Sequence, residues 1–279
     1  MTDFPVTAPL VERRQKAIGW GQLLLGTYVL LFFAFLLVPI AIVVLVSFSS
    51  SSFIVFPMPG FSAQWYYRII DYRPFMESLL VSVEIAFLSA FAGTMLGVPA
   101  AIWAVRARTT AAQVFTNLML APISVPAILL GFSLLYMLSA LTLGVSFMSL
   151  LITHTVVAIP YISRTVLAVY RSVPVDYEEA AAVLGASRRR IFFEITLPLI
   201  KPGIFAGALF SVLISMDNLP LSFFFGGAST STLPVVMLSY MQNQFDPSIA
   251  AIATVQMLIA LVALGIVNAI YGVEKLTAA

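Results

Sequence analysis

Long uninterrupted apolar stretches are the feature that most constrains how this chain can fold. About six of them reach the roughly 20 residues that a helix needs to cross the core of a bilayer. These stretches cover residues 23–46, 79–105, 114–141, 147–170, 204–225 and 250–271. They are too long and too continuously apolar for the strands of a membrane barrel, which have about ten residues and alternate. Because lipid offers no partners to backbone polar groups, the stretches predict helices and an all-α membrane protein.

The composition agrees with a bilayer location. Hydrophobic residues make up 61% of the 279-residue chain and charged residues only 9%, against about 25% in soluble domains. The chain has no cysteine, which excludes disulfides and thiolate metal sites. Its single histidine, His154, is interpreted as a buried hydrogen-bonding residue. We therefore expect no metal site, and we expect no nucleic-acid partner.

Basic residues predict which side of the membrane each connection faces. With about six spans, all but Arg68 and Arg73 of the 14 basic residues fall on or near one side, which the positive-inside rule assigns to the cytoplasm. Residues 1–22 and 273–279 are accordingly predicted to be cytoplasmic segments. Residues 23–74 are predicted to hold the first transmembrane helix and an outer loop, because the apolar run is too long for a cleaved signal peptide.

Small residues recur at four-residue spacing within two of the predicted spans. Gly93 and Gly97 share one face of the second span, and Gly203 and Gly207 share one face of the fifth. Small residues at this spacing allow helix backbones to approach closely in a membrane. We interpret both faces as packing surfaces inside the helix bundle.

The most informative stretch is the polar connection from Asp176 to Pro198. Asp176 and Glu179 have the spacing of a capping box at the start of a helix, and alanines follow them. Gly185 suits the left-handed position just after a helix end, and Ser187 can cap a second helix that runs towards Pro198. The connection therefore predicts a rigid helix–turn–helix element, suited to insertion into a groove on a partner.

This connection resembles the EAA loop of type I ABC-importer permeases. The pattern of that loop is matched by Glu179-Ala180-Ala181, then Gly185 after three residues, then Ile195-x-Leu197-Pro198 after nine more. The resemblance extends over residues 75–272, which would form the permease core. It implies the type I permease fold with a cytoplasmic coupling helix.

The resemblance also implies a division of labour between subunits. The ATPase-coupling residues would be Glu178, Glu179, Ala180, Ala181, Gly185, Ala186, Ile195, Leu197 and Pro198. The resemblance places the chain in the inner (plasma) membrane of a bacterium. The implied partners are an ABC ATPase dimer, a periplasmic or extracellular solute-binding protein and a second permease subunit. We expect that second permease to be a different protein and not a second copy of this chain. The chain has no GxxxxGK[ST] phosphate loop, so we expect that it is not an enzyme and binds no cofactor. ATP and Mg²⁺ are expected on the partner ATPase.

Polar and aromatic residues within the predicted spans are candidates for a substrate pathway, because charges in lipid are costly and often functional. Asp217 is expected deep in the fifth span, beside Asn218, either facing a pathway between two permeases or making a polar contact within the bundle. Glu84 either faces the pathway or is solvated at the outer end. Phe223 and Phe224 would form an aromatic belt, a plug or a cation–π surface.

Two segments resemble the spermidine/putrescine-type branch of this family. They are Ser215-Met-Asp217-Asn-x-Pro220 and Thr232-Leu-Pro-Val-x-Met237. Carboxylates with aromatic residues suit a cation, so the resemblance implies import of a polyamine or a related cationic amine. The alternative is the same machinery importing an opine, an aminophosphonate, an anion or a ferric ion. An intramembrane enzyme, the remote alternative, would need a catalytic mate for Asp217 or His154, and none is evident.

Overall fold

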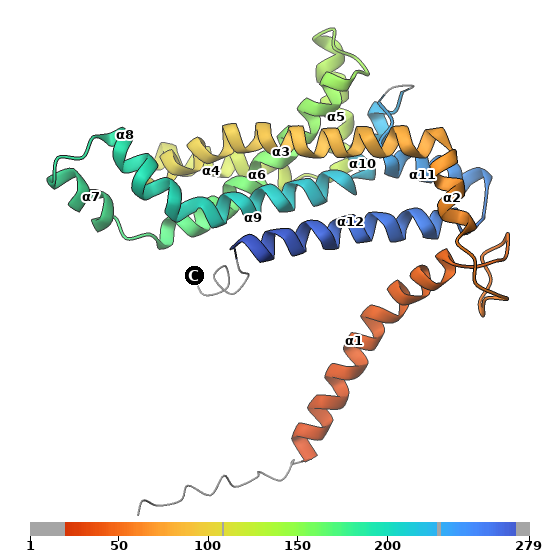
Figure 1. Cartoon of the computed structure of the whole chain (residues 1–279). Coiled ribbons are helices and arrows are strands. Elements are labelled where there is room, and N and C mark those ends of the chain that lie inside the picture. The colour runs from red at the N-terminus through yellow and green to blue at the C-terminus, as the bar shows by residue number, and fades with distance from the viewer. Residues whose placement is uncertain (1–19, 108, 228–229, 272–279) are drawn as a thin grey trace, which may run out of the picture.

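The computed structural model describes residues 20–107, 109–227 and 230–271, whose regular structure is helical (Figure 1). The longer helices are α1 (Trp20–Ser47), α3 (Arg73–Ala107), α6 (Phe147–Ser172), α9 (Leu197–Met216) and α12 (Ser248–Tyr271). The shorter elements are α2 (Gln64–Asp71), α4 (Thr110–Leu120), η1 (Ala121–Ser124), α5 (Ala127–Ala140), α7 (Asp176–Val183), α8 (Arg188–Ile191), η2 (Phe192–Thr196), α10 (Leu219–Ser222), η3 (Phe223–Phe225) and α11 (Leu233–Asn243). The predicted tail 273–279 and residues 1–19 of the predicted N-terminal segment lie outside the described residues.

Five helices of the described chain are long and apolar enough to cross a membrane, which confirms most of the predicted spans. They are α1, α3, α6, the continuous run Arg188–Met216 and α12. The predicted span 114–141 is not one helix, because α4 with η1 is bent by 108° against α5, and only the two together could make a sixth span. Two prolines explain the break. Pro122 and Pro126 lack amide donors, and Val125 before Pro126 is held extended.

The fifth predicted span is shifted towards the N-terminus. Instead of covering 204–225, the helical run ends at Met216. Asp217 is the C-cap of α9 and is exposed, so the prediction that it lies deep within a helix is wrong. The early end of α9 is explained by residues that start a second helix, α10, directly after it. The Asn218 side chain caps α10 by accepting a 3.2 Å hydrogen bond from the Leu221 amide, and a proline stands in the first turn of α10.

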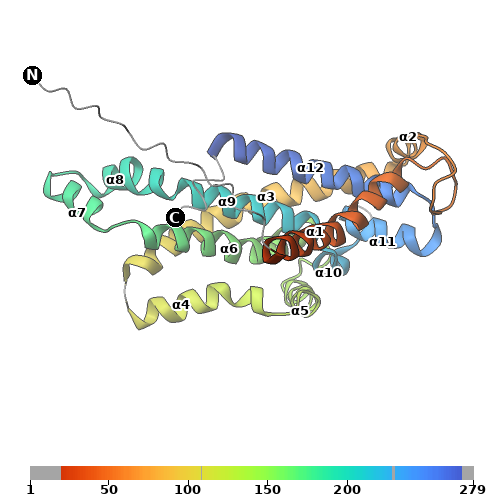
Figure 2. The same ribbon diagram turned by 90° about the horizontal axis from the view of Figure 1, so that it is seen from below.

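The core is built around α6, which packs against both α3 and α9 (Figures 1 and 2). A Cβ atom added to Gly97 of α3 would lie 2.7 Å from the Ser163 hydroxyl, and one added to Gly207 of α9 would lie 2.7 Å from the Ile162 Cα. A larger residue at either position would therefore meet α6, through its backbone at Gly207 and through the Ser163 side chain at Gly97. This confirms that the small-residue faces are packing surfaces inside the bundle.

The first helix, α1, extends away from this core (Figure 1). Only Val46 and Ser47, at its C-terminal end, are buried, so most of its apolar surface is free to face lipid or another chain. The connection that follows α1 is attached to α2. The Ser47 and Tyr66 hydroxyls lie 2.6 Å apart, and the Trp65 indole donates a 2.7 Å hydrogen bond to the Ser49 carbonyl.

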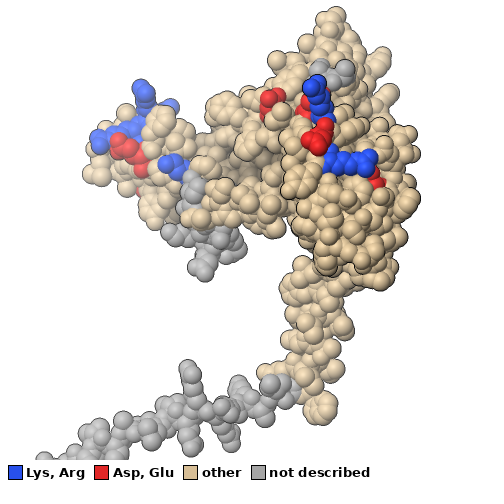
Figure 3. Space-filling model, turned by 45° about the vertical axis from the view of Figure 1, so that its right-hand side comes forward, with Lys and Arg blue, Asp and Glu red and all other residues tan. Residues whose placement is uncertain are grey.

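Charged side chains gather towards two ends of the molecule, with an uncharged surface between them on the face shown in Figure 3. The pair α7 and α8 forms one end, while α2 and α11 lie towards the other (Figures 1 and 2). This distribution suits a bundle whose middle is in lipid and whose ends are in water.

Candidate coupling loop and translocation path

The N-terminal end of α7 differs from its prediction. Asp176 is predicted as the N-cap of a capping box, but Asp176 is the first helical residue, and Val175 before it also has a helical conformation. The Val175 carbonyl accepts hydrogen bonds from the amides of Glu178 (3.0 Å) and Glu179 (3.1 Å), so these amides do not need a side-chain cap. The acidic residues of the first turn still stabilise the positive end of the helix dipole.

The C-terminal end of α7 confirms the predicted glycine turn. Gly185 has a φ of +85°, in the left-handed region that favours glycine. Its amide bonds to the Ala182 carbonyl and the Ala186 amide bonds to the Ala181 carbonyl, both at 3.0 Å. This pair of bonds is the Schellman motif, which ends a helix and reverses the chain within two residues.

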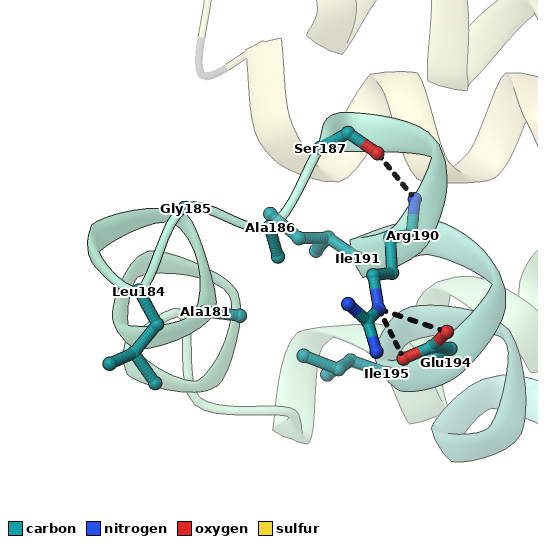
Figure 4. A pocket seen from close by; sticks show the side chains of 9 residues that line it. All are labelled: Ala181, Leu184, Gly185, Ala186, Ser187, Arg190, Ile191, Glu194 and Ile195. Carbon is teal, nitrogen blue, oxygen red and sulfur yellow. Dashed lines mark hydrogen bonds and ion pairs between the residues drawn. The ribbon is translucent and has the colours of Figure 1, made fainter.

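The tip of the loop is an exposed apolar surface. Val183 is 87% exposed and Leu184 is 88% exposed. Between α7 and α8 lies a groove of about 480 Å³, lined by Ala181 on one side and by Ile191 and Ile195 on the other (Figure 4). An exposed apolar surface at the charged end of a membrane protein is a candidate contact for another protein.

The second helix of the loop continues past Pro198. Ser187 caps α8 as predicted, accepting a 3.3 Å hydrogen bond from the Arg190 amide. Arg190 also forms an exposed ion pair with Glu194 at 2.9 Å, at the edge of the groove (Figure 4). The helix then widens into η2, a π-helix, and α9 follows with Pro198 in its first turn, where a missing amide donor disturbs few bonds.

Glu178 points from α7 towards the bundle. One of its carboxylate oxygens, Oε1, accepts hydrogen bonds from the Tyr170 hydroxyl (2.8 Å) and the Thr196 hydroxyl (2.7 Å), and lies 3.0 Å from Nη2 of Arg106. Burial by itself would raise the pKa of Glu178, but bonds from Arg106, Thr196 and Tyr170 hold that pKa below its ordinary value. The carboxylate is therefore ionised at neutral pH.

The predicted coupling residues thus fall into three groups. Glu179, Ala180, Gly185 and Pro198 are exposed, and Gly185 also borders the groove. The half-buried side chains of Ala181, Ala186 and Ile195 line the groove. Glu178 and Leu197 face the bundle instead, and Leu197 packs against the buried cluster that contains Tyr170 and Ile200.

The three partners of Glu178 were missed by sequence reasoning. Arg106 is in the last turn of α3, Tyr170 is near the end of α6, and Thr196 is the last residue of η2. The available signal was an arginine at the very end of an apolar stretch, facing an acidic loop across the same membrane surface. The sequence alone did not indicate which of the several acidic residues Arg106 would meet.

A second polar cluster, also missed, lies at the opposite end of the bundle. Arg68 of α2 pairs with Asp246 at 3.3 Å, and the Tyr240 hydroxyl donates a 2.8 Å hydrogen bond to the same carboxylate. The other oxygen of Asp246 accepts a 3.0 Å bond from the Ser248 amide at the start of α12. Asp246 therefore joins α2, α11 and α12.

His154 is a buried hydrogen-bonding residue in the N-terminal third of α6, as interpreted from the sequence. Its Nδ1 lies 2.7 Å from the Ser215 hydroxyl, and its Nε2 lies 3.0 Å from the Ser222 hydroxyl. Ser215 lies in the last turn of α9, one residue before its end at Met216, and Ser222 is the last residue of α10. The imidazole thus bridges the turn between α9 and α10, and this turn places Asp217 at the surface.

The candidate pathway residues come from separate elements. Asp217 and Glu84 are both exposed, on the end of α9 and on α3 respectively. Phe223 is 54% exposed and lines a hollow of about 420 Å³ together with side chains of α11. Phe224 is half-buried and packs against α5, with its ring centroid 5.9 Å from that of Phe132. The two phenylalanine rings are in contact, 5.7 Å apart.

Solved structures share this arrangement of helices. A chain of a bacterial ABC transporter involved in the import of the acidic polysaccharide alginate matches with a TM-score of 0.70 and 17% identity, covering 95% of this chain and 100% of that one. A chain of the MetNI methionine ABC transporter matches with a TM-score of 0.60 and 16% identity, covering 75% of this chain and 97% of that one. The fold is that of the membrane subunits of ABC transporters.

Sequence comparison then establishes the family. The family model described as binding-protein-dependent transport system inner membrane component matches residues 93–272. The putrescine transport system permease protein PotI of Escherichia coli K12 is 32% identical over 81% of this chain and 82% of its own length. The spermidine/putrescine permease PotC of the same organism is 31% identical over 87% of this chain and 91% of its own length. The chain belongs to the binding-protein-dependent transport system inner membrane component family.

Family membership confirms the general function that the EAA loop predicts. The chain is an inner-membrane permease subunit of an ABC importer, and it is not itself an enzyme. The family implies an ATP-binding partner and a binding protein that delivers the solute.

Proposed function

We propose that this permease subunit imports a polyamine, such as putrescine or spermidine, or a closely related cationic amine. The observation that carries the proposal is the similarity to PotI and PotC over more than four-fifths of the chain. The exposed carboxylates of Asp217 and Glu84 and the exposed ring of Phe223 support it. Carboxylates and aromatic faces both stabilise a positively charged amine.

In this proposal the substrate pathway runs between two permease subunits. Asp217 and Asn218 lie on it at the break between α9 and α10, and Glu84 contributes a second carboxylate from α3. Phe223 offers its exposed ring to the substrate, while Phe224 supports that ring from the side of α5. The second permease is a different chain in preference to a second copy.

The outer surface of α7 is proposed to dock on the ATPase. Glu179, Ala180 and Gly185 would contact a cleft on that partner, with the exposed side chains of Val183 and Leu184 at its centre. An ABC ATPase dimer would supply this cleft and bind ATP and Mg²⁺, whereas this chain would bind no cofactor. A short element ended by a Schellman turn suits the task because it moves as a unit.

The proposed topology follows from this docking. The end that carries α7 and α8 would be cytoplasmic, together with residues 1–22 and 273–279. The end with α2 and α11 would face outward and receive the solute-binding protein. The region 75–272 would form the permease core, and 23–74 an additional first helix with its outer loop.

The mechanism we propose is alternating access. The loaded binding protein docks on the outer surface, and ATP draws the two ATPase subunits together. Because α7 follows the ATPase cleft, the bundle opens outward and accepts the amine, and hydrolysis resets it. ATP hydrolysis thus takes place on the partner, while this chain converts the motion into access for the substrate.

Uptake by the reconstituted system tests the proposal. The permease would be placed in vesicles with its ATPase, its second permease and its binding protein, and given labelled putrescine or spermidine. ATP-dependent accumulation of either amine is expected, and unlabelled cationic amines should compete. If an opine, an aminophosphonate, an anion or a ferric ion is accumulated instead, the polyamine proposal is wrong although the permease assignment stands.

A further inference from the structure

One carboxylate oxygen joins the proposed coupling helix to all three central helices of the bundle. Oε1 of Glu178 on α7 contacts Arg106 at the end of α3, Tyr170 at the end of α6, and Thr196 just before α9. The partners are also connected to each other. Arg106 Nε donates a 2.7 Å hydrogen bond to the Tyr170 hydroxyl, and the guanidinium carbon lies 4.3 Å from the centre of the Tyr170 ring.

Apart from this cluster, α7 has little attachment to the rest of the chain. None of the eight described residues of α7 is buried. The side chain of Glu178 is 19% exposed, whereas Tyr170 and Thr196 are 2% and 3% exposed. The cluster is therefore shielded from water, which strengthens its electrostatic attraction relative to an exposed pair.

The exposed ion pair of the same loop shows the contrast. Arg190 and Glu194 form a pair at 2.9 Å whose side chains are 68% and 61% exposed, and both belong to one helical run. Such pairs contribute little to stability in water. The Arg106–Glu178 pair instead connects distant segments of the chain at a half-buried site, so its loss would free α7 from the bundle.

We propose that Glu178 is a positioning residue, which fixes α7 to α3, α6 and α9 so that the four helices move as one body. On this view Glu178 transmits motion and does not contact the ATPase, whereas its neighbour Glu179, which is exposed, lies in the contact. The inference rests on the proposed docking of α7 on the ATPase. It divides the coupling motif into a residue that faces the partner and a residue that faces the bundle.

Measurements of assembly and of coupling separate the two roles. The complete transporter in nanodiscs or vesicles would be prepared with Glu178→Gln, Arg106→Gln, the double variant and Glu179→Lys. Arg171→Gln, an exposed arginine next to Tyr170, is the matched control for removing a positive charge. Each preparation is assayed for bound ATPase, for ATP hydrolysis stimulated by the binding protein, and for solute taken up per ATP hydrolysed.

Glu178→Gln should retain the ATPase yet lower uptake per ATP by about tenfold, the scale set by losing a charge-assisted hydrogen bond. Arg106→Gln should also lower uptake per ATP, and the loss in the double variant should be smaller than the two single losses combined, because both single variants remove the ion pair between these side chains. Arg171→Gln should stay within about twofold of the parent, as surface substitutions usually do. If Glu178→Gln loses the ATPase as completely as Glu179→Lys does, Glu178 is a contact residue and the proposal is overturned.

A distance measurement tests the same point without the ATPase. The chain has no cysteine, so spin labels can be placed by Val183→Cys on α7 and Met95→Cys on α3 of the full-length permease in nanodiscs. The parent should give one narrow distance distribution, and Glu178→Gln should broaden it. An equally narrow distribution in Glu178→Gln would overturn the proposal. If the parent transporter itself does not bind an ATPase, the proposed docking of α7 is wrong. The distance measurement still tests whether Glu178 fixes α7 to the bundle.

Discussion

Nε2 of His154 lies 3.0 Å from the hydroxyl of Ser222, across the break between α9 and α10. The other ring nitrogen lies 2.7 Å from the Ser215 hydroxyl on the near side of the break. One imidazole thus holds both ends of the turn that presents Asp217 and Asn218. In lipid this arrangement also satisfies polar groups that would otherwise be buried without partners.

We expect His154→Phe, which keeps a ring and removes both nitrogens, to destabilise the protein. The loss should be about 1–3 kcal/mol, because two buried serine hydroxyls lose a partner, although hydrogen bonds in membrane proteins are often at the weaker end. Denaturant unfolding of the purified chain in micelles measures it. Ser172→Ala, at an exposed hydroxyl, should change stability by less than about 0.5 kcal/mol. A His154→Phe protein as stable as the parent would mean that the ring does not hold the turn.

Gly185 allows a graded test of the turn after α7. No heavy atom lies within 4 Å of a Cβ added there, so the only barrier to substitution is the positive φ. We expect Gly185→Asn to impair binding of the ATPase and coupled uptake least, Gly185→Ala more, and Gly185→Val most. The reason is that asparagine tolerates the left-handed region, whereas β-branched residues do not. The cost for alanine should be about 1–2 kcal/mol. Equal activity of all three variants would contradict the need for a left-handed residue.

The close approach of α9 to α6 predicts that Gly207→Ala is harmful. The new methyl group would lie 2.7 Å from the Ile162 Cα, a backbone atom that cannot rotate away. Overpacking of this kind typically costs about 1–3 kcal/mol. The matched control is Gly265→Ala on α12, where a Cβ meets nothing within 4 Å and the substitution should be neutral or slightly stabilising. Unfolding in micelles compares the two, and equal stabilities would argue against the packing described here.

Asp217→Asn tests the proposed pathway at nearly constant size. Loss of the carboxylate should reduce uptake of a diamine by about tenfold or more, equivalent to roughly 1.4 kcal/mol, while binding of the ATPase is unchanged. Because Asp217 is exposed at the end of α9, the fold should tolerate the change. Uptake of labelled putrescine at several concentrations is the measurement. Unchanged uptake would remove Asp217 from the pathway.

The exposed tip of α7 predicts a polar substitution that blocks docking. Leu184→Asp places a charge on a side chain that is 88% exposed, so the permease should fold and insert normally. If this surface meets the ATPase, the buried charge should weaken the complex by about 2 kcal/mol or more. Co-purification of the ATPase measures the effect. Undiminished co-purification would show that the docking surface lies elsewhere.

Local signals in the sequence were sufficient for much of the loop and of the bundle. The glycine turn at Gly185 and the cap at Ser187 depend on residues next to each other in the chain, and both are confirmed. The capping box predicted at Asp176 is wrong because the Val175 carbonyl accepts the amides that a side-chain cap would bind. The glycine faces that meet α6 were also read correctly, since a small residue every four positions marks a close contact whatever its partner is.

By itself, the sequence determined that this is a helical membrane protein with an EAA loop. The length of an apolar stretch and the spacing of a motif depend only on the order of residues along the chain. Only the tertiary structure decided that Asp217 ends a helix, that α4 and α5 are bent apart, and that Glu178 meets Arg106. Such contacts join residues far apart in the chain, and their energies depend on distances that no local pattern specifies. The Glu178 carboxylate could have faced water, lipid or a partner. It faces the bundle because the packing of α3, α6 and α9 brings Arg106, Tyr170 and Thr196 together beside it.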